Sequence, residues 1–185
     1  LVINTTVDQE ACMHNLAPTS STTAQMVMGD LMAITCMELR GFKSTDFAKF
    51  HPGGNLGKKI TLTTGAIAKQ NTQPSVQPTT SIKEVIIAIS KSRMGATVVL
   101  DDAGNIVGII TDGDIRRMLE QHNSIQELKA ADILHKQPIT ISSDTLAIEA
   151  FDLMKAHDIS QLIVADQGQY KGMIHIHDLM KEGIL

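Results

Sequence analysis

The stretch GIITDGD at residues 108–114 and its partial copy GMIHIHD at residues 172–178 decide the fold of this chain. Each begins with a glycine, continues with two aliphatic residues and ends with an aspartate. The offset that places residue 108 on residue 172 also places residues 98–100 on residues 162–164 without a gap. Self-similarity at one spacing is typical of a repeated supersecondary unit. We therefore expect the last two-thirds of the chain to be a tandem repeat.

Both copies contain the same predicted elements in the same order. In the first and second copy respectively, we predict a helix at 82–92 and 146–157, a strand at 96–100 and 161–164, and a strand at 106–111 and 170–175. A polar turn with glycine joins each pair of strands into a hairpin, and a last helix starts near Asp114 or Asp178. One unit is too small to bury its own sheet face, so the two units should pack together as a pseudo-symmetric pair.

The front of the chain, residues 1–60, does not belong to the repeat. The sequence predicts, in order, a strand at the apolar start 1–7, a helix at 23–40 that stops at Gly41, a short helix at 44–50 and a loop at 51–59. The chain does not begin with Met, and its strand-like start suggests a fragment of a longer protein.

Five consecutive hydroxyl side chains occupy residues 19–23, just before the first long helix. Together with the amides of the first helical turn they could bind a phosphate group. One of them could equally serve only as the helix N-cap, and the sequence leaves both interpretations open. The glycine-rich run at 53–59 is not the phosphate loop of an NTPase, because three residues separate Gly53 from Gly57 and no Ser or Thr follows Lys58.

The composition is that of an ordinary globular protein. Of 185 residues, 43% are hydrophobic and 19% are charged, and the net charge of −4 argues against a nucleic-acid-binding surface. No apolar run approaches the roughly 20 residues that a membrane span needs. The two cysteines, Cys12 and Cys36, do not form a disulfide framework, so we expect reduced thiols and a cytoplasmic protein.

The repeat resembles the cystathionine-β-synthase (CBS) repeat, which occurs in pairs, and the resemblance covers residues 64–185. Its most specific element is a glycine, two hydrophobic residues, a Thr or Ser, two further residues and an Asp, which residues 108–114 match in full. The resemblance implies a nucleotide or nucleotide-like ligand between the repeats, with Thr111, Asp114 and Asp178 as candidate contacts. Thr111 and Asp114 could instead only cap the last helix, with Asp114 as its N-cap.

The second copy departs from the pattern, because His175 stands where a Thr or Ser is expected. Whether this copy binds a ligand is therefore open. His175 and His177 could share one face of a strand end, as metal ligands would. No Cys or third ligand lies nearby in the sequence, so we expect no metal and no cofactor.

The front segment is similar to the second half of a sugar-isomerase (SIS) domain. The similarity rests on LAPTSSTTA at 16–24, MGD at 28–30 and FHPGGNLG at 50–57. An SIS domain followed by a CBS pair is the layout of the D-arabinose-5-phosphate isomerases, which serve the synthesis of 3-deoxy-D-manno-octulosonate (Kdo) for lipopolysaccharide or capsule. The resemblance implies an α/β fold: the C-terminal part of a Rossmann-like SIS αβα domain at 1–63, then CBS repeats at 64–127 and 128–185.

The resemblance also implies a reaction, the interconversion of D-ribulose 5-phosphate and D-arabinose 5-phosphate. Such an aldose–ketose isomerisation needs a group that moves a proton between two carbons, and carboxylates and imidazoles suit that role. Glu10 and His51 match two of the family's four catalytic positions. The resemblance implies that Glu10 acts as a general base or polarises a partner, and that His51 handles ring opening or proton transfer. A Lys and another Glu are expected before residue 1, so the chain alone should be inactive.

The same resemblance implies partners and an alternative. In related enzymes the histidine reaches a neighbouring subunit's site, which implies a homotetramer. The candidate ligands of the CBS pair are CMP-Kdo, a pathway end product, and an adenine nucleotide. The alternative function is a stand-alone regulatory binding module, in which the SIS remnant serves only for oligomerisation.

Overall fold

The computed structural model describes residues 2–50, 54–122 and 124–184, and it divides into two units, residues 1–47 and 48–185. The first unit is built on one long helix, α1 (Ser20–Leu39), which begins three residues before the predicted start. It ends as expected at Gly41, whose φ of 60° lets the Gly41 amide donate to the Glu38 carbonyl at 2.9 Å.

The strand predicted at the start of the chain is wrong for the residues described. Residues 2–7 carry no strand pairing. A strand is stable only beside a second strand, and the described part of this unit provides none. The short helix predicted at 44–50 is confirmed as α2 (Ser44–Phe50). Across the described residues, no helix has both the length and the apolar character needed to cross a membrane.

The loop predicted at 51–59 is partly wrong, because residues from 55 onward form α3 (Asn55–Thr61). Gly54 is the extended N-cap residue, and its carbonyl accepts the first helical hydrogen bond from the Lys58 amide at 3.0 Å. A tertiary contact then holds the helix, since Lys58 Nζ lies 2.8 Å from the Glu182 carboxylate at the other end of the chain. Residues 51–53 lie outside the described part.

The predicted elements of the repeat are confirmed, with additional short ones. The first copy contains β1 (Ser75–Val76), α5 (Ile82–Ser92), β2 (Ala96–Leu100), β3 (Ile106–Thr111) and α6 (Asp112–Gln121). The second contains β5 (Thr140–Ile141), α8 (Ala147–Ala156), β6 (Gln161–Asp166), β7 (Gln169–His175) and α9 (Ile176–Lys181). Between them lie α7 (Ala130–Ile133) and β4 (His135–Lys136), and before the first lies α4 (Thr64–Ala68).

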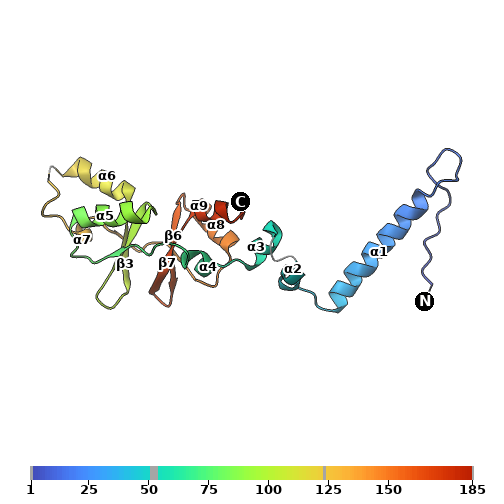
Figure 1. Cartoon of the computed structure of the whole chain (residues 1–185), viewed down its shortest axis with the longest axis horizontal. Coiled ribbons are helices and arrows are strands. Elements are labelled where there is room, and N and C mark those ends of the chain that lie inside the picture. The colour runs from blue at the N-terminus through green and yellow to red at the C-terminus, as the bar shows by residue number, and fades with distance from the viewer. Residues whose placement is uncertain (1, 51–53, 123, 185) are drawn as a thin grey trace. The chain divides into compact units, whose positions relative to one another are not determined.

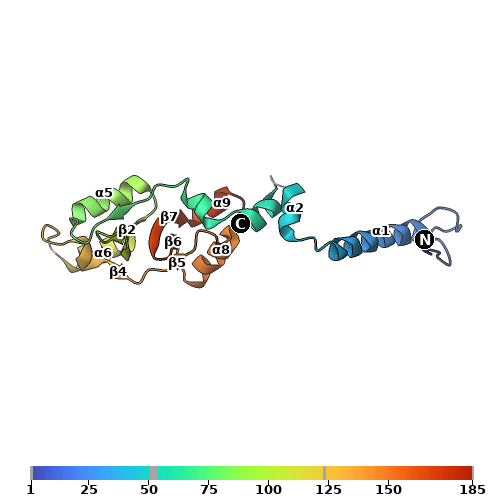
Figure 2. The ribbon, with the colours of Figure 1, turned by 90° about the horizontal axis from the view of Figure 1, so that it is seen from below.

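The strands form two sheets, with the orders β1-β2-β3-β4 and β5-β6-β7. In each sheet the first strand is parallel to the second, and the second and third form the predicted antiparallel hairpin. Helices α5 and α6 lie beside the first hairpin, and α8 and α9 beside the second (Figures 1 and 2). The two copies are thus built alike.

The gapless alignment of the two copies is wrong by one residue in the first strand of each hairpin. Five residues separate the paired Leu100 and Ile106, whereas four separate the paired Ala165 and Tyr170. The second turn is one residue shorter, so Val98 corresponds to Ile163. Side chains alternate between the faces of a strand, and a shift of one residue reverses which face each occupies.

The predicted pseudo-symmetric packing of the two copies is confirmed by a buried cluster that draws on both. It consists of Met94, Ala96 and Val98 from the first copy with Ile163 and Met173 from the second. Two further clusters lie between each sheet and its helices. The inner faces of the two sheets therefore bury each other.

The two halves also exchange their short helices. Ile67 and Ala68 of α4, which precedes the first copy, are buried in the core of the second. Ala130 of α7, which precedes the second copy, is buried in the core of the first. The glycine that opens each motif lets a neighbouring segment approach closely: a Cβ on Gly108 would lie 2.6 Å from the His135 carbonyl oxygen of β4, and one on Gly172 3.1 Å from the Ala68 Cβ of α4.

The hydroxyl of Thr97 on β2 is fully buried and lacks a hydrogen-bond partner among the described residues. Such a group costs about 1–3 kcal/mol of stability. We expect Thr97→Val, which removes the hydroxyl and keeps the shape, to raise the free energy of unfolding by about 1 kcal/mol in urea denaturation.

Thr64→Val is the matched control, because the buried Thr64 hydroxyl donates to the Ser142 carbonyl at 2.6 Å. That substitution should lower the free energy of unfolding by about 1 kcal/mol or more. Equal losses in the two variants would contradict the assignment of Thr97 as an unpaired group.

Candidate ligand-binding site

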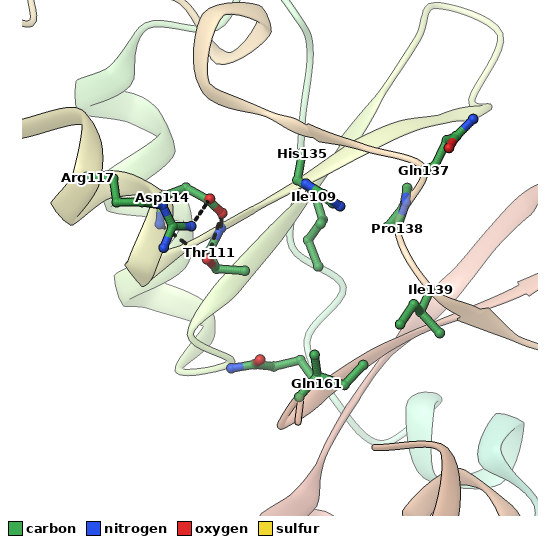
Figure 3. A pocket seen from close by; sticks show the side chains of 10 residues that line it. Ile109, Thr111, Asp114, Arg117, His135, Gln137, Pro138, Ile139 and Gln161 are labelled. Carbon is green, nitrogen blue, oxygen red and sulfur yellow. Dashed lines mark hydrogen bonds and ion pairs between the residues drawn. The ribbon is translucent and has the colours of Figure 1, made fainter. Parts of the chain in front are cut away.

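A cavity of about 230 Å³ lies between the two repeats, beside the end of β3 and the start of α6. Ten residues line it: Ile109, Thr111, Asp114, Arg117, His135, Gln137, Pro138, Ile139, Ile159 and Gln161. They come from the first repeat, from the segment that joins β4 to β5, and from the second repeat at the beginning of β6 and just before it (Figure 3). The site therefore exists only when both repeats are packed together.

Thr111 and Asp114, two of the predicted contacts, form the polar end of this cavity. Thr111 is the N-cap of α6, and its amide and hydroxyl donate to the Asp114 carboxylate at 2.8 and 2.6 Å. Asp114 is thus the third helical residue of a capping box and not the N-cap that the sequence suggested as an alternative. The two residues cap the helix and also line the cavity (Figure 3).

Arg117 was missed by the sequence analysis, although it lies on the same helical face as Asp114, three residues later. Its guanidinium forms an ion pair with the Asp114 carboxylate. The Arg117 side chain is 64% exposed. Burial raises the pKa of Asp114, but the hydrogen bonds from Thr111 and Arg117 together outweigh burial and hold the pKa below its usual value. Asp114 is therefore charged near neutral pH.

The remaining walls of the cavity are mostly aliphatic. Ile109, Ile139 and Ile159 with Pro138 supply apolar surface, and Gln137 and Gln161 supply amides. Figure 3 shows Gln161 extending toward the cavity from the strand of the second repeat, whereas Arg117 comes from the helix of the first. Apolar walls with a few directed polar groups are typical of a small-molecule site. These residues carry no local motif, which is why the sequence did not reveal them.

Asp178, the third predicted contact, does not line this cavity. It lies in the second repeat, where His175 is the N-cap of α9 and donates its amide to Asp178 at 2.8 Å. The His175 and His177 rings stack with their centroids 4.7 Å apart, and His175 Nδ1 accepts the His177 amide. Burial, and then the neighbouring His177, lowers the pKa of His175 against the opposing effect of Asp178.

The two histidines line a second cavity, of about 380 Å³, together with Arg93 and Asp112. In the described parts of the chain, no group of three or more His, Cys, Asp or Glu side chains is arranged as metal ligands would be.

In the first unit, the predicted catalytic residue Glu10 caps α1. Its Oε2 accepts the Thr19 amide at 2.7 Å, the Thr19 hydroxyl at 3.1 Å and the Ser21 amide at 3.2 Å. Hydrogen bonds from the Ser21 hydroxyl and the Thr19 amide, in that order, lower the pKa of Glu10 to about 2. This carboxylate explains why α1 begins three residues before its predicted start. It accepts the amides at the helix N-terminus to which, on the sequence alone, a phosphate could bind.

His51, the other predicted catalytic residue, lies outside the described residues. The hydroxyls of Thr22 and Thr23 both donate to the Thr19 carbonyl at 2.9 Å. The contacts described for the hydroxyl side chains of residues 19–23 are therefore those expected at a capped helix N-terminus.

Comparisons with known proteins agree with the repeat. The family model of the CBS domain matches residues 69–121 and 130–184. A CBS domain protein of Pyrobaculum aerophilum, solved in complex with AMP, has a TM-score of 0.58 and 26% identity over 64% of this chain and 90% of its own.

The whole chain also matches named enzymes. It is 41% identical to arabinose 5-phosphate isomerase KdsD of Yersinia pestis and 39% identical to that of Escherichia coli K12, in each case over 97% of its length. The matches cover 55% of each relative, so the chain spans about half the length of these isomerases.

We expect the capping box of α6 to make stability depend on acid pH. Because the pKa of Asp114 is lower in the folded state, its contribution is present above the unfolded-state pKa and is lost as pH falls through the folded-state value. Asp114→Asn should therefore lower the melting temperature at pH 7 and have a smaller effect near pH 3. A loss that is the same at both pH values would contradict the ionic role.

Proposed function

Because the chain belongs to the CBS-domain family, we propose that its two repeats form a regulatory module that binds a nucleotide in the cavity beside Thr111 and Asp114. The cavity is the observation that carries this proposal. Its aliphatic walls suit a base, and the Asp114 carboxylate and Thr111 hydroxyl suit the hydroxyls of a ribose. The exposed guanidinium of Arg117 suits a phosphate.

The solved relative from Pyrobaculum aerophilum supports the class of ligand, since that protein is complexed with AMP. CMP-Kdo remains the second candidate, because it is a nucleotide-sugar and an end product of the pathway that the isomerases serve. Both contain a ribose and a phosphate, which are the groups that the polar end of the cavity suits.

The module is proposed to regulate a D-arabinose 5-phosphate isomerase of the Kdo pathway. The identity of 41% over 97% of the chain supports this assignment. Glu10 and His51 are the proposed catalytic residues, and the sugar phosphate is the proposed substrate. In its described contacts, however, Glu10 has a pKa of about 2 and would be a weak base near neutral pH.

The front segment is proposed to need protein partners, as in a homotetramer. Helix α1 has no buried residue in the described structure, and Met26, Leu31 and Ile34 are each more than half exposed. Exposed apolar surface of this kind marks an interaction site. It equally favours the alternative function, a stand-alone nucleotide-binding module that assembles through this segment.

Nucleotide binding is tested by thermal melting of the chain with AMP, ATP, CMP and CMP-Kdo. A ligand that binds only the folded state adds about 2.7 kcal/mol at 100 times its dissociation constant. We expect a rise in melting temperature with at least one of them, and its loss in Asp114→Ala. No shift with any of the four would contradict the proposed function.

The isomerase assignment predicts that this chain alone does not interconvert D-ribulose 5-phosphate and D-arabinose 5-phosphate. Glu10 is engaged as a helix cap, and the family's Lys and other Glu have no match in the chain. Measurable turnover by the purified chain would contradict this prediction. A full-length relative such as the Escherichia coli enzyme is the positive control for the assay.

A further inference from the structure

The two repeats carry equivalent polar motifs, but the aspartates of the two motifs differ in their hydrogen-bond partners. In each, an aspartate accepts the amide of the residue three positions earlier at 2.8 Å, Asp114 from Thr111 and Asp178 from His175. The partners of Asp114 in the described structure are Thr111 and Arg117, both from its own helical turn. The carboxylate of Asp114 therefore faces a cavity without a described hydrogen-bond partner from elsewhere in the fold.

Asp178 has a further partner from a distant part of the chain. The Nδ2 atom of Asn71 donates to the Asp178 carboxylate at 2.8 Å and to the Met173 carbonyl at 3.1 Å. Both hydrogens of this amide are used, one on the helix cap and one on β7. Asn71 follows α4, the short helix that packs in the core of the second repeat, so its position is held by buried contacts.

The corresponding segment of the first site leaves its cleft open. That segment follows α7, and its residues His135, Gln137 and Pro138 line the walls of the cavity beside Asp114. One difference between the two sites is therefore the residue that follows the short helix: Asn71 reaches the aspartate of the second site, whereas the corresponding segment of the first site lines the cavity.

We infer that Asn71 closes the second cleft by occupying the Asp178 carboxylate, so that the chain binds one nucleotide, at Asp114, and not two. The inference rests on the proposed nucleotide-binding function. A ribose entering the second site would have to displace the Asn71 amide from two acceptors at once. It would then leave the Met173 carbonyl without that partner, which is costly for a buried polar group.

The replacement of Thr by His acts in the same direction. At the first site the Thr111 hydroxyl is next to the carboxylate and lines the cavity. At the second site the His175 Nδ1 atom already accepts the His177 amide. His175, which departs from the family pattern, and Asn71 thus share one acceptor, because the His175 amide and the Asn71 side chain both donate to the Asp178 carboxylate.

The test is isothermal titration of the chain with AMP, for the wild type and for the matched variants Asp114→Asn and Asp178→Asn. We expect one AMP per chain, affinity lowered about tenfold or more by Asp114→Asn, and affinity within about twofold of the wild type for Asp178→Asn. Asn71→Ser serves if Asp178→Asn does not fold, and it too should leave the affinity of the first site unchanged.

The possible outcomes distinguish the closed second cleft from the proposed nucleotide binding. Two AMP molecules per wild-type chain, or equal losses of affinity in the two aspartate variants, would refute the closed second cleft while leaving nucleotide binding intact. No binding of AMP by the wild type would refute the proposed function for this nucleotide, and the single site with it. As a readout at the second cleft, the Nδ2 proton resonances of Asn71 should stay unchanged when AMP saturates the wild type.

Discussion

The contact between the inner faces of the two sheets is the interaction on which the rest of the second unit depends. Met94, Ala96 and Val98 of one repeat pack against Ile163 and Met173 of the other, and all five are buried. Burial of each larger aliphatic side chain contributes roughly 1.5–3 kcal/mol. Without this contact each hairpin would expose an apolar face, and the cavity would lose one wall, because Ile109 and Gln161 come from different repeats.

The exchange of short helices makes this contact hard to separate from the rest of the fold. Because α4 packs in the core of the second repeat and α7 in the core of the first, neither repeat has a complete core made only from its own residues. The same exchange brings Asn71 to Asp178 and Gln137 to the first cavity. The difference between the two clefts therefore arises from the segments that precede each repeat, which carry Asn71 and Gln137, together with the change from Thr111 to His175 at the end of the hairpin.

Several polar groups have a structural role that also prepares them for chemistry. Asp114 and Thr111 close the first turn of α6, and in doing so they hold a charged carboxylate and a hydroxyl at the edge of the cavity. Glu10 is held in the same way at the start of α1, but its carboxylate is directed at backbone amides. A helix N-terminus binds whichever anion is near, and in the described first unit that anion comes from the chain itself.

The amino-acid sequence by itself determined the repeat, its helices and hairpins, and the positions of Thr111 and Asp114, because periodic burial, turns and caps are local patterns within a few residues. It did not determine the register shift at Val98 and Ile163, the exchange of α4 and α7, or the pairing of Asn71 with Asp178. The exchange and the Asn71–Asp178 pair were decided by the tertiary structure, because each depends on which segments distant in the sequence meet. The register shift is visible only in the strand pairing, where the second hairpin turn is one residue shorter. Gln161, His135 and Arg117 became members of a site for the same reason: a cavity between two packed repeats has no sequence pattern of its own.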